Sequence, residues 1–163
     1  MIAPLYHGSE GISYYSSITI MALGASSSTT SDAGLNQVTI LNNKGMSLYN
    51  SGRFNESIAC FDKALVIDPK NVATLDNKGL ALLSVSINNY TQAITYYDRV
   101  LTIHPKNVAA LDNRGVAFYH LGNYTKAITY YDKALAIDLK NAVGLTDKGN
   151  ALSALRNYTV AIA

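Results

Sequence analysis

The sequence predicts an all-α fold in which antiparallel helix pairs stack into a solenoid. Two observations lead to this prediction: a unit of about 34 residues recurs along the chain, and both halves of each unit space their apolar residues as a helix does. A unit of this length cannot bury its apolar face alone, so successive units are expected to stack around one continuous core.

Three sequence blocks define the repeat. The first is a polar tetrad ending in glycine, whose four copies follow at intervals of 34, 36 and 34 residues. The copies end at Gly45, Gly79, Gly115 and Gly149. The second block starts with an aromatic residue, at 54–58, 90–94, 124–128 and 158–162. The third joins an aromatic residue to aspartate, at 61–65, 97–101 and 131–135.

The first half of each unit is predicted to be a helix that contains the tetrad. Leu41, Gly45 and Leu48 share one face of this helix in the first unit. Glycine inside a helix costs about 1 kcal/mol relative to alanine, so its recurrence indicates that another helix comes close. The two additional residues of the second unit fall within 83–88, between its two helices.

The second half of each unit is predicted to be the partner helix. Its small residue, Ala127 in the third unit, is expected to be buried where two helices meet. Gly52 and Gly122 mark the preceding turns, and the predicted N-caps are Asn55, Thr91, Thr125 and Thr159. Pro69 and Pro105 end two of these helices. Leu139 replaces the proline in the third unit, so that helix is expected to run on smoothly.

Composition excludes several classes of function. The 163 residues carry a net charge of +2 and scattered basic side chains, which argues against a nucleic-acid binder. The single cysteine, Cys60, excludes an internal disulfide or a multi-cysteine zinc site and is expected to be a small buried hydrophobe. His120 is expected to be a surface or groove side chain. Without a phosphate-binding loop, metal motif or triad pattern, we expect no cofactor, no metal and no enzymatic activity.

These features resemble the tetratricopeptide repeat, in which large apolar, glycine, aromatic, alanine and proline residues stand at fixed offsets within 34 residues. The first unit matches at Leu41, Gly45, Leu48, Phe54, Phe61, Ala64 and Pro69. The resemblance covers about 38–163 and implies a right-handed α-solenoid. About three full units, at 38–71, 72–107 and 108–141, and a partial fourth unit at 142–163 are expected.

One departure from the family is the basic residue before each tetrad glycine, where the family has leucine. The four are Lys44, Lys78, Arg114 and Lys148. This position lies about 60° off the core face, so we expect the stems to pack while the charges reach solvent. The acid–base pairs at 62–63, 98–99 and 132–133 are expected to be a solvated surface.

Residues 1–35 stand outside the repeat and are expected to be a flexible lead-in to the array at 36–163. The stretch 26–31 is typical of a linker, and the apolar run at 18–23 is too short to span a bilayer. The alternative for this segment is a degenerate signal peptide. A cytoplasmic location is favoured, and export stays open. Turn chemistry is preferred over N-glycosylation for the four sequons, which begin at Asn55, Asn89, Asn123 and Asn157.

The resemblance also implies where a ligand would bind, because first helices of tetratricopeptide arrays line a concave, peptide-binding surface. The corresponding groove residues are Asn42, Asn43, Met46, Asp76, Asn77, Leu80, Asp112, Asn113, Val116, Tyr119 and Asn150. The ladder of Asn43, Asn77 and Asn113 offers amides that can pair with an extended peptide backbone. The family's carboxylate clamp is not reproduced. Asp76 and Asp112 are expected to repel a terminal carboxylate and to favour a neutral or basic peptide.

The leading hypothesis is a non-enzymatic scaffold or adaptor that binds a peptide or protein segment of unknown identity in this groove. Two alternatives stay open. The array could associate end to end with itself through residues 161–163, which have no capping helix. The lack of a capping helix also leads us to expect that the chain is a piece of a longer array. It could instead be the recognition arm of a larger enzyme, since glycosyltransferases with tetratricopeptide arms carry a similar asparagine ladder.

Overall fold

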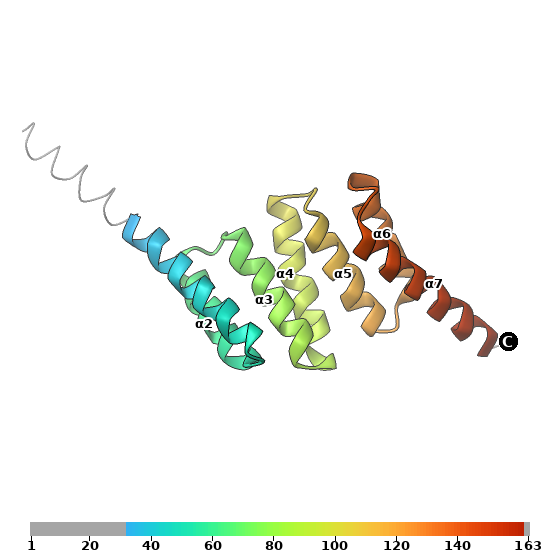
Figure 1. Ribbon diagram of the computed structural model, residues 1–163, viewed down its shortest axis with the longest axis horizontal. Helices are drawn as coiled ribbons and strands as arrows, with labels where there is room; N and C mark the ends of the chain where they lie inside the picture. The colour runs from blue at the N-terminus through green and yellow to red at the C-terminus, as the bar shows by residue number, and fades with distance from the viewer. Residues whose placement is uncertain (1–31, 162–163) are drawn as a thin grey trace, which may run out of the picture. The chain divides into compact units, whose positions relative to one another are not determined.

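The computed structural model describes residues 32–161, and its regular elements over this range are all helices (Figure 1). A first helix covers 32–50. It is followed by α2 (Phe54–Ile67), α3 (Val72–Val85), the 3₁₀ helix η1 (Ile87–Asn89), α4 (Tyr90–Ile103), α5 (Val108–His120), α6 (Tyr124–Ile137) and α7 (Ala142–Ala161). The predicted linker and signal-like run lie outside the described residues. The chain divides into two compact units, Met1–Gln37 and Val38–Ala163, and the second unit is the repeat array.

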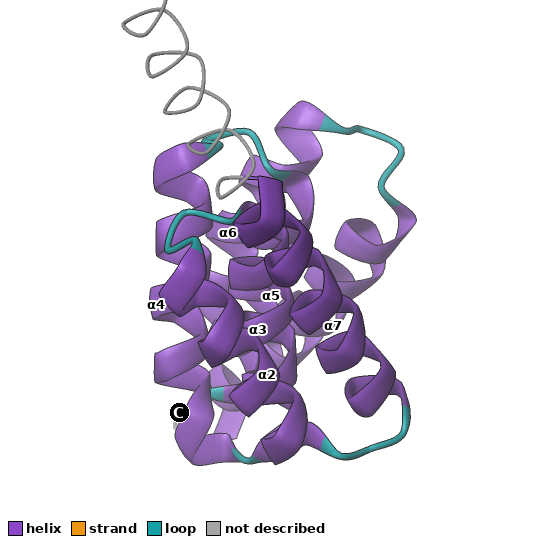
Figure 2. Ribbon diagram, turned by 90° about the vertical axis from the view of Figure 1, so that its left-hand side faces the viewer, coloured by secondary structure: helices purple, strands orange, loops and turns teal. Residues whose placement is uncertain are grey.

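Each helix of the array packs against the next one in the chain, which confirms the predicted all-α solenoid. The helices α2 to α7 follow one another across Figure 1 in sequence order, and Figure 2 shows the loops at the ends of the helices, toward the top and bottom of that view. Two further contacts, of α3 with α5 and of α5 with α7, bring the first helices of successive units together. No described helix is both long enough and apolar enough to cross a bilayer.

The core is built from an aromatic ring that packs under each of the first three tetrad glycines. Phe61, Tyr97 and Tyr131 are at most 1% exposed. A Cβ atom added at Gly45, Gly79 and Gly115 would lie 2.4, 2.7 and 2.5 Å, respectively, from these rings. The close approach predicted from the recurring glycine is therefore confirmed in three units.

The fourth unit differs from the other three. A Cβ atom at Gly149 would meet nothing within 4 Å, so the expected close approach is wrong there. The reason is that α7 continues without a break to Ala161, and no second helix folds back over it within the described residues. Thr159 and Asn157 accordingly lie inside α7 rather than at a turn.

The predicted N-caps of α2, α4 and α6 are each wrong by two residues. These helices begin at the aromatic residue of the second block, so Thr91 and Thr125 are already inside the first turn. The N-cap of α6 is Asn123, whose side chain accepts a hydrogen bond from the Lys126 amide at 3.1 Å. In α2 the N-cap is Arg53, and Asn55 lies inside the helix.

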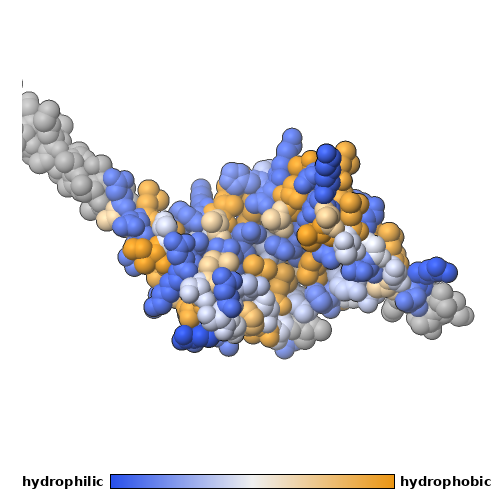
Figure 3. Space-filling view, in the orientation of Figure 1, coloured by the Kyte–Doolittle hydropathy of each residue, from blue (hydrophilic) through white to orange (hydrophobic). Residues whose placement is uncertain are grey.

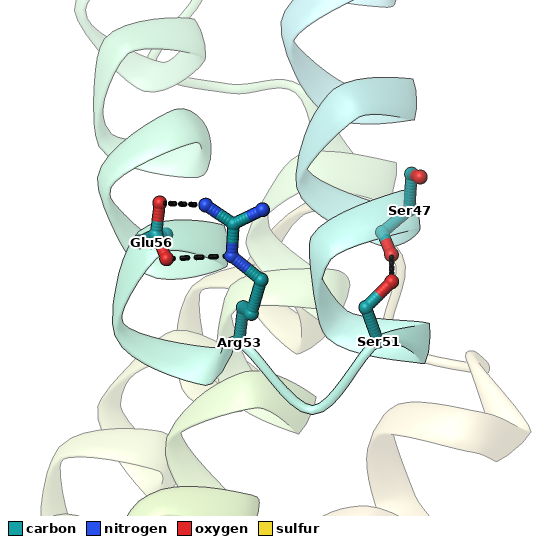
Figure 4. Close-up of polar contacts among 4 residues, drawn as sticks. All are labelled: Ser47, Ser51, Arg53 and Glu56. Carbon is teal, nitrogen blue, oxygen red and sulfur yellow. Dashed lines mark hydrogen bonds and ion pairs between the residues drawn. The ribbon is translucent and has the colours of Figure 1, made fainter.

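The turn before α2 shows why a glycine is needed there. Gly52 has φ of +74°, a left-handed conformation that favours glycine, and Gly122 repeats it in the third unit. Figure 4 shows the flanking contacts: the Ser51 hydroxyl donates to the Ser47 carbonyl at 2.9 Å, and Arg53 forms a forked pair with Glu56 at 2.7 and 2.5 Å. Both members of this pair are 57% exposed.

The expectation that the third unit's second helix runs on past Leu139 is wrong, because α6 ends at Ile137. The Asp138 side chain accepts a hydrogen bond from the Lys140 amide at 3.0 Å, and its carbonyl accepts one from the Asn141 amide at 3.2 Å. This aspartate-centred turn ends the helix without a proline. The two additional residues of the second unit are accommodated at Ser86 and η1, as expected from their position.

Candidate functional site

The candidate site is the face of the first helices on which the predicted groove residues lie, here called the first-helix surface. Two hydrogen bonds join this face between the helix at 32–50 and α3. The Asn77 amide nitrogen donates to Asn42 Oδ1 at 3.0 Å, and the hydroxyls of Tyr49 and Ser84 lie 3.2 Å apart. Residues of neighbouring units therefore meet on this surface, as a shared binding face requires.

Most of the predicted groove residues are half-buried. Asn43 and Asn150 are exposed and Asp112 is buried; the half-buried members are Asn42, Met46, Asp76, Asn77, Leu80, Asn113, Val116 and Tyr119. The three asparagines of the predicted ladder make no hydrogen bonds with one another. Within the described range, the side chains of Asn43 and Asn113 have no hydrogen-bond partner, and the Asn77 side chain uses only its amide donor, toward Asn42.

A residue that the sequence prediction missed, Asn141, fixes Asp112. The Asn141 side chain caps α7 by accepting from the Gly144 amide at 3.1 Å, and its amide nitrogen donates to Asp112 Oδ2. Gly144 leaves room for this contact, because a Cβ there would lie 3.0 Å from Asp112 Oδ1. A signal was present in the sequence: Asn71 and Asn107 occupy the same N-cap position before α3 and α5.

Three carboxylates on the first helices have raised pKa values. Burial raises the pKa of Asp76. Burial also raises the pKa of Asp112, opposed by its hydrogen bond from Asn141 and reinforced by the charges of Asp147 and Asp138. The pKa of Asp147 is likewise raised by burial, and His120 opposes that change. The first-helix surface thus holds carboxylates that are less stable in their charged form than they would be in water.

His120 lies in an aromatic cluster at the end of α5. Its ring stacks on Tyr90 with 5.0 Å between centroids, and the neighbouring Tyr119 packs against Tyr124 at 5.5 Å. His120 is exposed, which agrees with its predicted place at the surface. The described residues contain no group of three or more potential metal ligands.

Three of the four basic residues of the tetrads pair with acids of the preceding unit, and the fourth, Lys44, is exposed. Lys78 pairs with Asp62 of the preceding unit, and Arg114 and Lys148 pair with Asp98 and Asp132 at 2.5 and 2.6 Å. The acids Asp62, Asp98 and Asp132 were expected to form a solvated surface, and they are indeed exposed or half-buried. Each of them also forms an ion pair with the following unit, which was not predicted. The expectation that the tetrad charges reach solvent is wrong for Lys78, which is 5% exposed.

Aromatic rings complete the environment of these cations. Lys78 Nζ donates to the Tyr96 hydroxyl and lies 4.3 Å from the centre of that ring. The Arg114 guanidinium lies 4.3 Å from the centre of Tyr130, the equivalent residue of the next unit. The first unit has Cys60 at this position. Cys60 was expected to be buried but is half-buried, and it lines a hollow of about 430 Å³ beside Lys44. The three paired cations Lys78, Arg114 and Lys148, here called the cation ladder, therefore join successive units through acids of the second helices.

Apolar and polar residues alternate over the visible face of the array in Figure 3, with no single unbroken apolar area. The larger exposed apolar side chains are distributed along the chain and include Val66, Leu139 and Val143. An extended apolar interface is therefore not apparent on the face shown, and the polar first-helix surface is the better candidate for specific recognition.

Comparison with known proteins supports the repeat. Residues 38–71 and 78–142 match family models that are both described as tetratricopeptide repeat, and the two matches together cover more than half of the chain. A search of curated proteins gave no match.

Several solved structures resemble the array. The first TPR of Spaghetti (RPAP3) bound to HSP90 peptide SRMEEVD is 21% identical, with a TM-score of 0.69 over 74% of this chain and 94% of that chain. The Arabidopsis OM64 TPR domain is 21% identical, with a TM-score of 0.70 over 74% and 98%. The Sgt2 TPR domain from Aspergillus fumigatus is 17% identical, with a TM-score of 0.70 over 76% and 82%. At these identities the likeness is one of fold.

Proposed function

Because this chain belongs to the tetratricopeptide repeat family, we propose that it is a non-enzymatic interaction module that binds an extended peptide or protein segment along its first-helix surface. The proposal uses the family's arrangement of first helices but rests on side chains of this chain. It assigns the array the role of a scaffold or adaptor.

The observation that carries the proposal is the unused hydrogen-bonding capacity of asparagines at one register on three successive first helices. The side chains of Asn43 and Asn113 have no hydrogen-bond partner within the described range, and the side-chain oxygen of Asn77 accepts no hydrogen bond there. An amide offers a donor and an acceptor, which an extended peptide backbone complements at regular intervals. The half-buried Met46, Leu80 and Val116 lie on the same face and supply apolar contact area beside these amides.

Structural neighbours support this reading. One is bound to HSP90 peptide SRMEEVD, and the second TPR domain of human RPAP3 is in complex with HSP70 peptide SGPTIEEVD. The latter aligns over 72% of this chain with a TM-score of 0.67 at 19% identity. The same fold therefore holds peptides in other proteins, and the first-helix surface is where we expect this chain to hold one.

A phage-displayed library of random dodecapeptides, selected on the full 163-residue chain, tests the proposal. Enriched peptides are synthesised and titrated against the double variant Asn77→Ala/Asn113→Ala. Each lost hydrogen bond is worth about 0.5–1.5 kcal/mol, so affinity should fall roughly tenfold for peptides of unrelated sequence.

The matched control is Asn55→Ala/Asn157→Ala, which removes two exposed asparagine side chains that are not among the predicted groove residues. It should leave affinity within about twofold of wild type. Failure to enrich any peptide, or equal losses in the two double variants, would contradict the proposed binding surface.

A further inference from the structure

The acids of the array divide into two groups according to the helix that carries them. On α2, α4 and α6 the acids each have a basic partner: Glu56 pairs with Arg53, and Asp62, Asp98 and Asp132 pair with the tetrad cations. On α3, α5 and α7 the acids are Asp76, Asp112 and Asp147, and none of them forms an ion pair within residues 32–161. Unpaired negative charge is therefore concentrated on the first helices.

The basic residues of the same helices cannot neutralise this charge, because most of them are already bound elsewhere. Lys78, Arg114 and Lys148 are held by acids of the preceding second helices. Of the three acids, only Asp147 is influenced by a basic side chain, His120, within the described residues. A chain with a net charge of +2 thus presents a locally negative first-helix surface.

Two carboxylate oxygens of this row lack a hydrogen-bond donor although they are buried. They are Oδ1 of Asp76 and Oδ1 of Asp112, and Asp112 as a whole is 7% exposed. The hydroxyl of the fully buried Tyr97, whose pKa is raised by burial and to a lesser extent by the charge of Asp76, is also without a partner. A buried charged acceptor without a donor costs free energy, and a cationic donor is the group that relieves this cost most strongly.

We propose that the segment bound along the first-helix surface is basic, with lysine or arginine side chains that pair with Asp76, Asp112 and Asp147. This rests on the proposed function and specifies its partner. Rotation about χ2 of aspartate is broad, and within residues 32–161 no hydrogen bond holds the half-buried Asp76 side chain, so its carboxylate can turn the orphaned oxygen toward an incoming cation. The asparagines then hold the backbone of the segment while the aspartates select its side chains.

The spacing of the acids predicts a spacing of the basic residues. First helices of neighbouring units contact one another, and packed helices lie about 8–10 Å apart. In a polyproline II segment, residues three apart lie on the same side at about 9 Å, because the rise is about 3.1 Å with three residues per turn. Basic residues at every third position would therefore reach successive carboxylates.

Synthetic dodecapeptides labelled with fluorescein test this on the full chain by fluorescence anisotropy. The probe carries lysine at every third position, and matched peptides carry glutamine or glutamate there or place the same lysines consecutively. We expect the spaced lysine peptide to bind at least tenfold more tightly than the glutamine peptide and more tightly than the clustered one. The glutamate peptide should bind most weakly, and the preference should shrink as salt is added.

Variants separate the site from general electrostatic attraction. Asp76→Asn/Asp112→Asn should weaken the spaced lysine peptide by about tenfold and leave the glutamine peptide unchanged. The control Glu56→Gln/Asp132→Asn removes the same charge from second helices, at side chains 57% and 51% exposed, and should change affinity by less than twofold. Equal losses in the two double variants, or equal affinities for the lysine and glutamine peptides, would overturn the basic partner.

The phage selection keeps the two proposals apart. Enriched peptides without lysine or arginine that still respond to Asn77→Ala/Asn113→Ala would refute the basic partner and leave the proposed function standing. Absence of any enriched peptide would instead count against the binding surface itself.

Discussion

The glycine that ends each tetrad allows one substitution to be compared in four repeats with opposite expected signs. Alanine is favoured over glycine inside a helix by about 1 kcal/mol, so Gly→Ala stabilises wherever the new methyl group has room. At Gly149 nothing lies within 4 Å of the added Cβ. We therefore expect Gly149→Ala to stabilise the array by about 1 kcal/mol.

At Gly115 the same methyl group would lie 2.5 Å from the Tyr131 ring. That ring is 1% exposed, so it can move only by disturbing the packing of α5 against α6. Overpacking of this kind costs about 1–3 kcal/mol, and an overlap this severe belongs near the upper end. After the gain in helix propensity, Gly115→Ala should destabilise by about 1–2 kcal/mol.

Thermal unfolding followed by circular dichroism at 222 nm measures both effects. For an array of this size, 1 kcal/mol corresponds to about 4 °C in Tm, so the variants should differ by roughly 8–12 °C. In a Tyr131→Leu background the cost of Gly115→Ala should largely disappear, because the clashing ring atoms are gone. A Gly149→Ala variant as unstable as Gly115→Ala would refute the assignment of the glycine to ring packing.

Two further stability predictions concern contacts between units. A double-mutant cycle on Lys78 and Asp62 by chemical denaturation should give a coupling of about 1–2 kcal/mol, because Lys78 is nearly buried, and a clearly smaller coupling for the exposed Arg53–Glu56 pair; equal couplings would contradict a structural role for the cation ladder. Ala127→Leu should lower stability by about 1–3 kcal/mol because Ala127 is 0% exposed, whereas Ala136→Leu, at an exposed position of the same helix, should change it by less than 0.5 kcal/mol.

The fold could be predicted from the sequence because its determinants are local and repeated. The contact of Gly79 with Tyr97 in the second unit recurs as that of Gly115 with Tyr131 in the third, so packing inferred for one unit applies to the next. The prediction failed where this repetition stops. Nothing in the tetrad ending at Gly149 shows that α7 continues to Ala161, because the tetrad itself is unchanged.

The candidate surface was harder to predict because it depends on contacts between units. Helical spacing placed Asn42 and Asn77 among the predicted groove residues, but it could not predict the bond between them, which joins residues 35 apart in the chain. The pairing of Asp62 with Lys78 likewise joins two units, so the adjacent residues Asp62 and Lys63 predicted only a solvated surface and not this ion pair. The role of Asn141 was recoverable, since asparagine precedes three of the first helices, but its bond to Asp112 was not.

The acids of the first helices should reduce stability at neutral pH, and Asp76 shows this most simply because burial is the cause of its raised pKa. The folded chain retains the Asp76 proton at pH values where the unfolded chain, with a pKa near 3.8, has lost it. The free energy of unfolding therefore falls as pH rises from the unfolded pKa through the folded pKa, and this loss is complete above that window.

Asp76→Asn mimics the protonated carboxyl group at every pH. It should raise Tm at about pH 7, and the difference from wild type should shrink as pH falls through the window and vanish below about pH 3. Asp132→Asn, at an exposed and paired carboxylate, should show no such gain. A lower Tm for Asp76→Asn at neutral pH would contradict the argument. A basic peptide would offset the cost of the charge, so the spaced lysine peptide should raise the Tm of wild type more than that of Asp76→Asn.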